Sequence, residues 1–169
     1  MIVSFSVLCK AAGSAAVAGS VLAWILWQRR ADAERLRRLD SLIAFVYFAR
    51  EQVDRYLSPV SEILRRCDAA ILDGCRIGCP ERAGEIRDLA HLNELLSTGT
   101  YASDGQAAIG EFAAAFGRSY REEELRSCDV CAEELSRLRA TLAETLPGKR
   151  RSRAVLGSCA AAAIIILLL

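Results

Sequence analysis

Hydrophobic positions recur at helical spacing through the middle of the chain. Over residues 32–57 they lie three, four or seven positions apart, which places them on one face of an amphipathic helix. This stripe consists of Leu36, Leu39, Ile43, Val46, Val53 and Leu57. A longer stripe over residues 120–146 consists of Leu125, Cys128, Cys131, Leu135, Leu138, Leu142 and Leu146. The pattern therefore predicts two long helices.

Shorter helices are predicted between the two long ones. Ser58-Pro59 restarts the chain with an N-cap and a proline at the first helical position, and this helix extends to about Leu72. The stretch "DGCRIGCP" is typical of a loop, and a further helix follows over residues 81–96. No alternating pattern predicts a strand.

Capping signals mark the last two helices. Ser103–Gln106 has the spacing of a capping box, and Gly117 is expected to end the helix that this box opens. Ser119–Glu122 has the same spacing at the start of the second long helix. Pro147-Gly148 is expected to end that helix.

The N-terminal 27 residues are uncharged except for Lys10, and most of them are apolar. A bilayer core needs roughly 20 residues of helix, and this segment is long enough. Trp24 and Trp27 suit the membrane interface just before Arg29. A cleaved signal peptide is the alternative, but its basic residues precede the apolar run, whereas here they follow it. Residues 1–28 are therefore predicted to form a transmembrane helix.

The C-terminal stretch "AVLGSCAAAAIIILLL" has sixteen residues and no charge. As a helix it spans about 24 Å, which is short for a bilayer core of about 30 Å. The alternative is a buried helix in a soluble bundle. A helix without a polar face lies in a protein core or in lipid, and a terminal helix of a small domain is rarely fully buried. Residues 149–169 are therefore predicted to hold basic residues and a second transmembrane helix.

Basic residues border both apolar ends on the side of the middle region. These basic collars are Arg29, Arg30, Lys149, Arg150, Arg151 and Arg153. Residues 31–148 contain 15 Arg against 21 Asp and Glu, a net charge of about −6. The positive-inside rule places both collars in the cytoplasm as membrane-flanking charges. An acidic body does not favour a nucleic-acid partner.

Together these patterns predict an all-α fold, a helical bundle of about five helices between an N-terminal and a C-terminal transmembrane helix. Residues 29–148 form the expected cytoplasmic domain. Its two long helices are expected to pair antiparallel, because both lead to the membrane on the same side, and the short helices pack over them.

The chain has seven cysteines, and an odd number does not indicate a completed disulfide framework. Cys75, Cys79, Cys128 and Cys131 have a spacing that allows four zinc thiolates. Cys128 and Cys131, however, lie on an apolar stripe, where a thiol behaves as a small hydrophobic group. Buried thiols are therefore favoured over a metal site, and no cofactor is expected.

No catalytic group stands out. The single histidine, His91, lies in a predicted helix beside apolar positions, where a structural or surface role fits better than a catalytic dyad. The stretch "GSAAVAGS" lacks the lysine of a phosphate-binding loop. A protein that is not an enzyme is therefore expected.

The order of these features resembles the stage III sporulation protein AB family. The resemblance lies in "RRADAERLRRLDSLIAFVYFAREQVDRYLSPVSEIL", "EFAAAFGRSYREEELRSCDVCAEELSRL" and "RAVLGSCAAAAIIILLL". It covers nearly the whole chain through helix starts and apolar positions. The chain departs from the family pattern at Ser58-Pro59-Val60, where the family tends to have Thr-Pro-Leu, and at Tyr120, where it tends to have Asp.

The family is similar to the cytoplasmic helical domain of type II secretion system F proteins. The resemblance implies a scaffold subunit of the channel assembly between mother cell and forespore, in the mother-cell membrane facing the forespore. The implied partners are the lipid bilayer, other membrane subunits of that assembly and a cytoplasmic secretion-type ATPase. Two alternatives stay open: a generic secretion or pilus platform subunit, and a metal- or redox-responsive membrane protein that uses the four cysteines.

Overall fold

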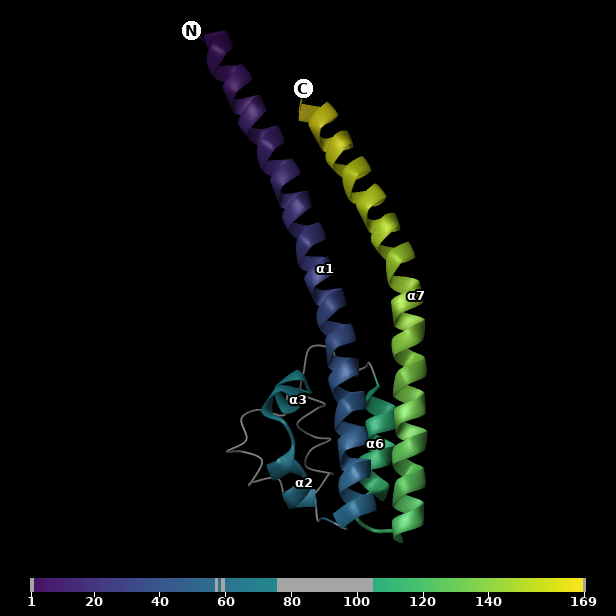
Figure 1. Ribbon diagram of the computed structural model, residues 1–169. Coiled ribbons are helices and arrows are strands. Elements are labelled where there is room, and N and C mark those ends of the chain that lie inside the picture. Colours follow the sequence, from purple (N-terminus) through teal and green to yellow (C-terminus); the bar gives the residue numbers. More distant parts are fainter. Residues whose placement is uncertain (1, 57, 59, 76–104, 169) are drawn as a thin grey trace. The chain divides into compact units, whose positions relative to one another are not determined.

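Five α-helices make up the described part of the chain (Figure 1). The computed structural model describes the backbone of residues 2–56, 58, 60–75 and 105–168, and within these ranges the side chains except those of 2–12, 60, 61, 165, 167 and 168. The helices are α1 (Ile2–Tyr56), α2 (Val60–Arg66), α3 (Ala69–Gly74), α6 (Gln106–Ala115) and α7 (Arg121–Leu168). The predicted all-α class is confirmed.

The chain divides into two compact units, which are described separately. The body, Glu34–Leu142, contains α2, α3, α6 and the adjoining parts of α1 and α7. The arm unit consists of Met1–Ala33 and Ala143–Leu169, which hold the beginning of α1 and the end of α7.

The body has one apolar core that lies between the two long helices and the short ones. The large core side chains of α1 and α7 are Leu39, Leu42, Phe45, Val46, Val53, Cys128, Cys131 and Leu135. The short helices add Ile63, Leu64, Leu72, Ile109 and Phe112. Full burial of such a side chain contributes roughly 1.5–3 kcal/mol, so this core is the main stabilising element of the body. Leu138, a member of the predicted stripe, is 37% exposed.

Ion pairs between α1 and α7 define the register of the two helices in the body. The pairs are Asp40 with Arg139, Arg50 with Asp129 at 2.7 Å, and Asp54 with Arg121 at 2.6 Å. Along α1 the residue numbers rise while those of the partners on α7 fall. The predicted antiparallel pairing of the long helices is therefore confirmed. Exposed pairs of this kind contribute about 0–1 kcal/mol each, so they specify register more than they add stability.

The helix predicted from Ser58 to Leu72 is instead two helices, α2 and α3. Asp68 interrupts it with an extended backbone conformation, and its carboxylate accepts a hydrogen bond from the Ala70 N–H at 2.8 Å. An aspartate N-cap satisfies a helix-terminal donor that has no partner within the helix. The capping geometry of Asp68 thus overrides the apolar period that continues through this segment.

Glycines with positive φ lie at both ends of α6. Gly105 precedes the helix with φ 78°, and no side chain caps it, so the predicted capping box Ser103–Gln106 is wrong: the helix begins only at Gln106. Gly117, one residue beyond the C-cap Phe116, has φ 81°. Glycine adopts this left-handed conformation without steric cost, which confirms Gly117 as the signal that ends the helix.

The N-terminus of α7 is capped differently from the predicted box Ser119–Glu122. The Tyr120 carbonyl accepts hydrogen bonds from the N–H groups of Glu123 and Glu124, at 2.9 and 3.0 Å, so the helix begins at Arg121. The Glu124 carboxylate accepts a further bond from the Gly117 N–H at 2.9 Å. That bond ties the end of α6 to the start of α7.

The prediction that Pro147-Gly148 ends the last long helix is wrong, because α7 continues through both residues to Leu168. A proline in a helix interior removes one hydrogen bond and costs roughly 3 kcal/mol. Contacts on both sides of it offset that cost: Leu146 is buried, and Arg150 forms an ion pair with Asp32. At the other end of the chain, α1 runs unbroken from Ile2, consistent with the absence of glycine and proline between residues 20 and 56.

Within the described residues, no helix is long and apolar enough to cross a membrane. The predicted transmembrane helices at 1–28 and 149–169 are therefore not confirmed. The side chains of residues 2–12, 165 and 167–169, on which the prediction also relied, lie outside the described part. The helix predicted over residues 81–96, with His91, and the loop residue Cys79 also lie outside it.

Replacing Gly105 by alanine is expected to lower the free energy of unfolding by about 1–3 kcal/mol. An added Cβ would lie 2.7 Å from Leu135 Cδ2, and the positive φ would strain any L side chain. Gly148→Ala is the matched control, because it lies within α7 and its Cβ would meet nothing within 4 Å. Alanine there is expected to raise stability by up to about 1 kcal/mol. Urea unfolding followed by circular dichroism measures both changes, and equal effects would contradict the role of Gly105.

Candidate functional site

Three of the four candidate zinc cysteines are buried free thiols in the body, and so is Cys67. Cys67, Cys75, Cys128 and Cys131 all lie in the core, and the Cys131 Sγ–H donates to the Ala108 carbonyl at 3.7 Å. In the part of the chain that the structure describes, no three Cys, His, Asp or Glu side chains come together as metal ligands. Cys79, the remaining member of the proposed zinc set, lies outside that part.

Burial sets the chemistry of these thiols. Desolvation raises the pKa of Cys67 to about 11 and the pKa of Cys75, Cys128 and Cys131 to about 12. Because the thiolate is the nucleophile and the metal ligand, a thiol that stays protonated at neutral pH is a poor reagent for either role. The four side chains act as small apolar core groups.

Two residues of the basic collars, Arg150 and Arg153, form ion pairs within the arm unit. Asp32 is only 2% exposed, and its carboxylate lies 3.3 Å from Arg150 Nε and 3.5 Å from Arg153 Nη1. One aspartate of α1 thus holds two arginines that lie one helical turn apart on α7. This cluster fixes the two helices of the arm unit against each other.

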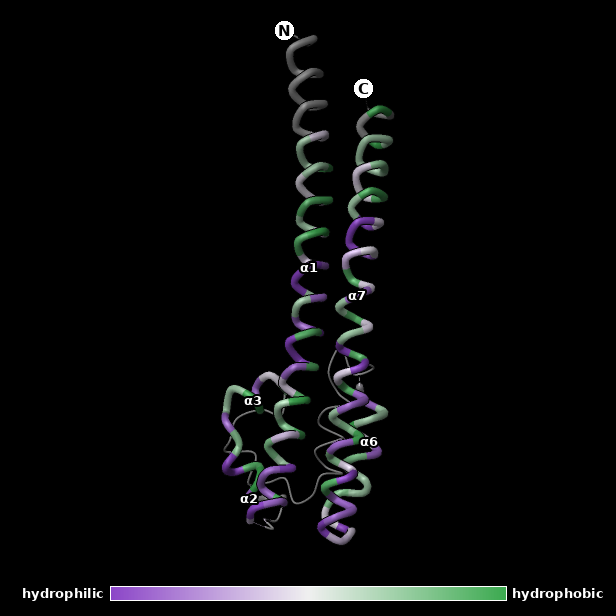
Figure 2. The backbone as a smooth tube through the Cα atoms, turned by 45° about the vertical axis from the view of Figure 1, so that its right-hand side comes forward, coloured by the Kyte–Doolittle hydropathy of each residue, from purple (hydrophilic) through white to green (hydrophobic). Residues whose placement is uncertain are grey.

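The other four collar residues, Arg29, Arg30, Lys149 and Arg151, are exposed. They lie on α1 and α7 close to the Asp32 cluster in sequence. Figure 2 shows a hydrophilic stretch after the apolar beginning of α1 and another before the apolar end of α7. These four side chains are the collar charges that remain available to a partner or a surface.

Large apolar side chains are exposed along both helices of the arm unit. They are Leu22, Trp24, Leu26 and Trp27 on α1, and Val155, Leu156, Ile164 and Ile166 on α7. Leu22 is 61% exposed and Leu156 is 70% exposed. The two helices also contact each other, since a Cβ on Gly157 would lie 3.3 Å from Val21. Pairing of the helices therefore covers one face of each and leaves the others apolar and open.

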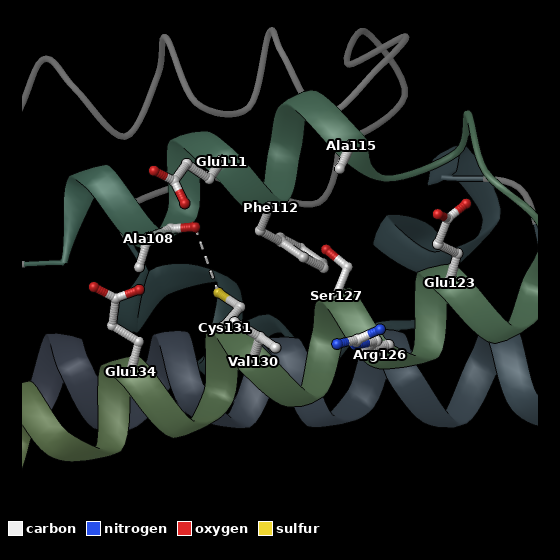
Figure 3. Close-up of a pocket in the computed structure, with 10 residues that line it drawn as sticks. All are labelled: Ala108, Glu111, Phe112, Ala115, Glu123, Arg126, Ser127, Val130, Cys131 and Glu134. Carbon is white, nitrogen blue, oxygen red and sulfur yellow. Dashed lines mark hydrogen bonds between the residues drawn. The ribbon is translucent and has the colours of Figure 1, made fainter.

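A groove of about 390 Å³ lies between α6 and α7 in the body (Figure 3). The buried side chains of Ala108, Phe112 and Cys131 lie at its base, and Val130, 58% exposed, lies on its α7 side. The remaining lining residues are Glu111, Ala115, Glu123, Arg126, Ser127 and Glu134. The charged groups are three carboxylates and one guanidinium, so the lining is acidic.

In the described part of the chain, the glutamates of the groove take part in few ion pairs. Within the described residues, Glu111 and Glu123 form no ion pair, and Glu134 approaches only Arg137, at 3.9 Å. The groove was not predicted from the sequence, because its lining comes from two helices. The spacing of residues along each helix does not determine the angle at which the two helices pack. The available signal in the sequence was Val130, an apolar residue that lies outside the predicted apolar stripe, one position before Cys131.

Comparison with known proteins returns no relatives: no family model matches the chain, and no curated protein and no solved structure is significantly similar to it. The resemblance to the stage III sporulation protein AB family stays a prediction.

Replacing Asp32 by asparagine is expected to lower the free energy of unfolding by about 1–3 kcal/mol, because it leaves two partly buried guanidinium groups without their counter-ion. Asp40→Asn is the matched control: it removes the same kind of bond between α1 and α7, but both partners are about half exposed. Its expected cost is about 0–1 kcal/mol. Thermal unfolding of the two variants measures the difference. A cost at Asp40 equal to that at Asp32 would show that burial does not strengthen the cluster.

The buried thiols are expected to resist alkylation by iodoacetamide at pH 9 in the native protein. A free thiol of ordinary pKa is largely ionised there, whereas one with a pKa of about 12 is about one part in a thousand thiolate. The same raised pKa values stabilise the body below about pH 9, and this contribution is lost as the pH rises toward 12. Mass spectrometry of the alkylated peptides assigns each site, with the same protein unfolded in urea as the reactive control. Rapid native labelling of Cys128 would contradict this assignment.

Proposed function

We propose that the chain is a non-enzymatic platform subunit, held at a membrane by its arm unit and presenting its helical body to partner proteins. The observation that carries this proposal is the set of large apolar side chains exposed on both helices of the arm unit. A soluble protein rarely exposes so many large apolar groups without a binding role.

The exposed collar residues support a membrane as the contact of the arm unit. Arg29, Arg30, Lys149 and Arg151 are cations at the border of the apolar surface, where they suit anionic headgroups. Each such cation contributes about 1 kcal/mol of attraction to an anionic surface. Arg150 and Arg153 add less to this attraction, because Asp32 cancels one of their two charges.

The proposed anchor includes more than the described side chains. It extends through residues 2–12 at one end and through residues 165–169 at the other, which complete the apolar stretches in the sequence. In this arrangement both collars face the cytoplasm, and the body lies there as well.

The proposed biological setting rests on the sequence resemblance. It is the channel assembly between mother cell and forespore, with a secretion-type ATPase as the cytoplasmic partner. A generic secretion or pilus platform would use the same anchored body, and endospore formation by the source organism distinguishes the two. Purification of the full chain from its native membrane, followed by mass spectrometry, tests the ATPase: its absence contradicts the docking role alone.

Flotation with vesicles of phosphatidylcholine and phosphatidylglycerol tests the membrane role directly. Wild-type protein is expected to float with the vesicles. A variant with Leu22→Glu and Leu156→Glu is expected to stay largely in the aqueous fraction, because each charge in the apolar region costs about 2.5–3.5 kcal/mol. Both leucines are exposed, so the changes remove no core packing.

The matched control for flotation carries Tyr47→Glu and Tyr120→Glu, two exposed apolar positions in the body. This variant is expected to float like the wild type. Flotation of the arm variant at the wild-type level, or failure of the wild type to float, would sink the membrane proposal. If the wild-type chain instead forms a stable dimer without lipid and the Leu22→Glu, Leu156→Glu variant does not, the apolar surface binds a second copy of the chain.

A further inference from the structure

We propose that the groove between α6 and α7 binds an amphipathic helix of a partner protein, with apolar residues on one face and lysine or arginine beside them. This inference deepens the proposed function, since it names the class of segment that the body of the platform would hold. It rests on the proposal that the body docks a partner, but not on the membrane role.

The backbone around the groove favours a helical ligand over an extended one. Both walls are α-helices, α6 and α7, whose interior N–H and C=O groups bond within the helix. An extended peptide gains its affinity by pairing with a free strand edge, and neither wall offers one. Recognition must therefore come from side chains, as it does when an amphipathic helix lies in an apolar groove.

The apolar part of the groove supplies a place for the anchor residues of such a helix. Phe112 and Cys131 are buried at the base, and Ala108 and Ala115 leave room beside them because they are small. Val130 is the one large apolar side chain of the lining that stays open to solvent. A leucine or isoleucine placed against Val130 would remove both side chains from water.

The charge of the groove selects a basic partner. Glu111 on α6 faces the groove opposite Glu123 and Glu134 on α7, and Figure 3 shows these carboxylates along its borders. Neighbouring arginines use other acids: Arg50 pairs with Asp129 and Arg121 pairs with Asp54. Arg126 is the single cation of the lining, so the preferred partner is basic without being uniformly so.

The length of the groove sets the length of the helix that fits it. Glu123 and Glu134 lie on the same helix, and the rise of 1.5 Å per residue places them about 16 Å apart along α7. That distance corresponds to about three turns of a bound helix. A segment of this size offers three or four anchor positions at a spacing of three and four residues.

Fluorescence anisotropy with a synthetic helix tests the groove. The probe is a fluorescein-labelled peptide of about fourteen residues, with leucine on one face and lysine beside it. The full chain in a nonionic detergent is expected to bind it, and to bind a peptide with glutamate in place of lysine at least about tenfold more weakly. Detergent without protein gives the background. Raising the salt concentration from about 50 to about 300 mM is expected to weaken binding of the lysine peptide.

Two double variants with the same change of charge locate the binding surface. Glu111→Lys with Glu134→Lys reverses charge in the groove and is expected to weaken binding by about tenfold or more. Glu133→Lys with Glu144→Lys reverses two charges of α7 that do not line the groove, and is expected to change binding less than about twofold. Val130→Ser tests the apolar contact without changing the charge of the groove, and is expected to weaken binding at any salt concentration.

Three outcomes would overturn the proposal. They are equal effects of the two double variants, equal binding of the lysine and glutamate peptides, and unchanged binding after Val130→Ser. A dimer in sedimentation that Val130→Ser dissociates would also overturn it, because the groove would then hold a second copy of the chain. Circular dichroism confirms that each variant is folded. Vesicle flotation of the groove variants is expected to match the wild type, so failure here and failure of the membrane role remain distinguishable.

Discussion

The antiparallel contact of α1 with α7 is the interaction on which the rest of the body depends. Both helices give their apolar stripes to one core, and the three ion pairs beside it allow a single register. By contrast α2, α3 and α6 have 7, 6 and 10 residues, lengths at which isolated helices are marginal in water. They form because their apolar side chains are buried against the core side chains of the two long helices. Gly74 shows how close this packing is, since a Cβ there would lie 2.7 Å from Ser41 Cβ.

The period of apolar residues was sufficient to predict the long helices and six of their core residues, but it did not predict the core residues of the short helices. Burial of one face repeats at the helical period, so the sequence carries that information directly. Helix ends were predicted less well, because several local groups compete to cap them. Asp68 divides one predicted helix, and backbone bonds to Tyr120 start another without the expected box. The helix end predicted at Pro147 was wrong because the rule considers only the residues next to the proline. Leu146 and Arg150 form contacts with residues distant in the sequence, and these contacts stabilise the helix on both sides of the proline.

The candidate surfaces were only partly accessible from the sequence for a related reason. The collars were found as a run of charges, but the run does not reveal that Asp32 claims Arg150 and Arg153. Asp32 and its partners are more than a hundred residues apart, and only the pairing of α1 with α7 brings them together. The groove needs one step more, because its lining depends on how α6 lies on α7. The spacing of residues along one helix does not determine how α6 packs on α7.

Charge that the fold does not use is the common feature of both proposed surfaces. On α1 and α7, the charged residues at the helix contact are consumed by it: Asp40, Asp54 and Asp129 each hold an arginine, and Asp32 holds two. Among the residues that the structure describes, the groove glutamates and the four exposed collar residues form no such pair between α1 and α7. Each of these unused sets lies beside apolar side chains that stay open to solvent, and they have opposite sign. A body acidic at its groove and arms basic at their border can therefore meet a basic helix and an anionic surface without either competing for the other's site.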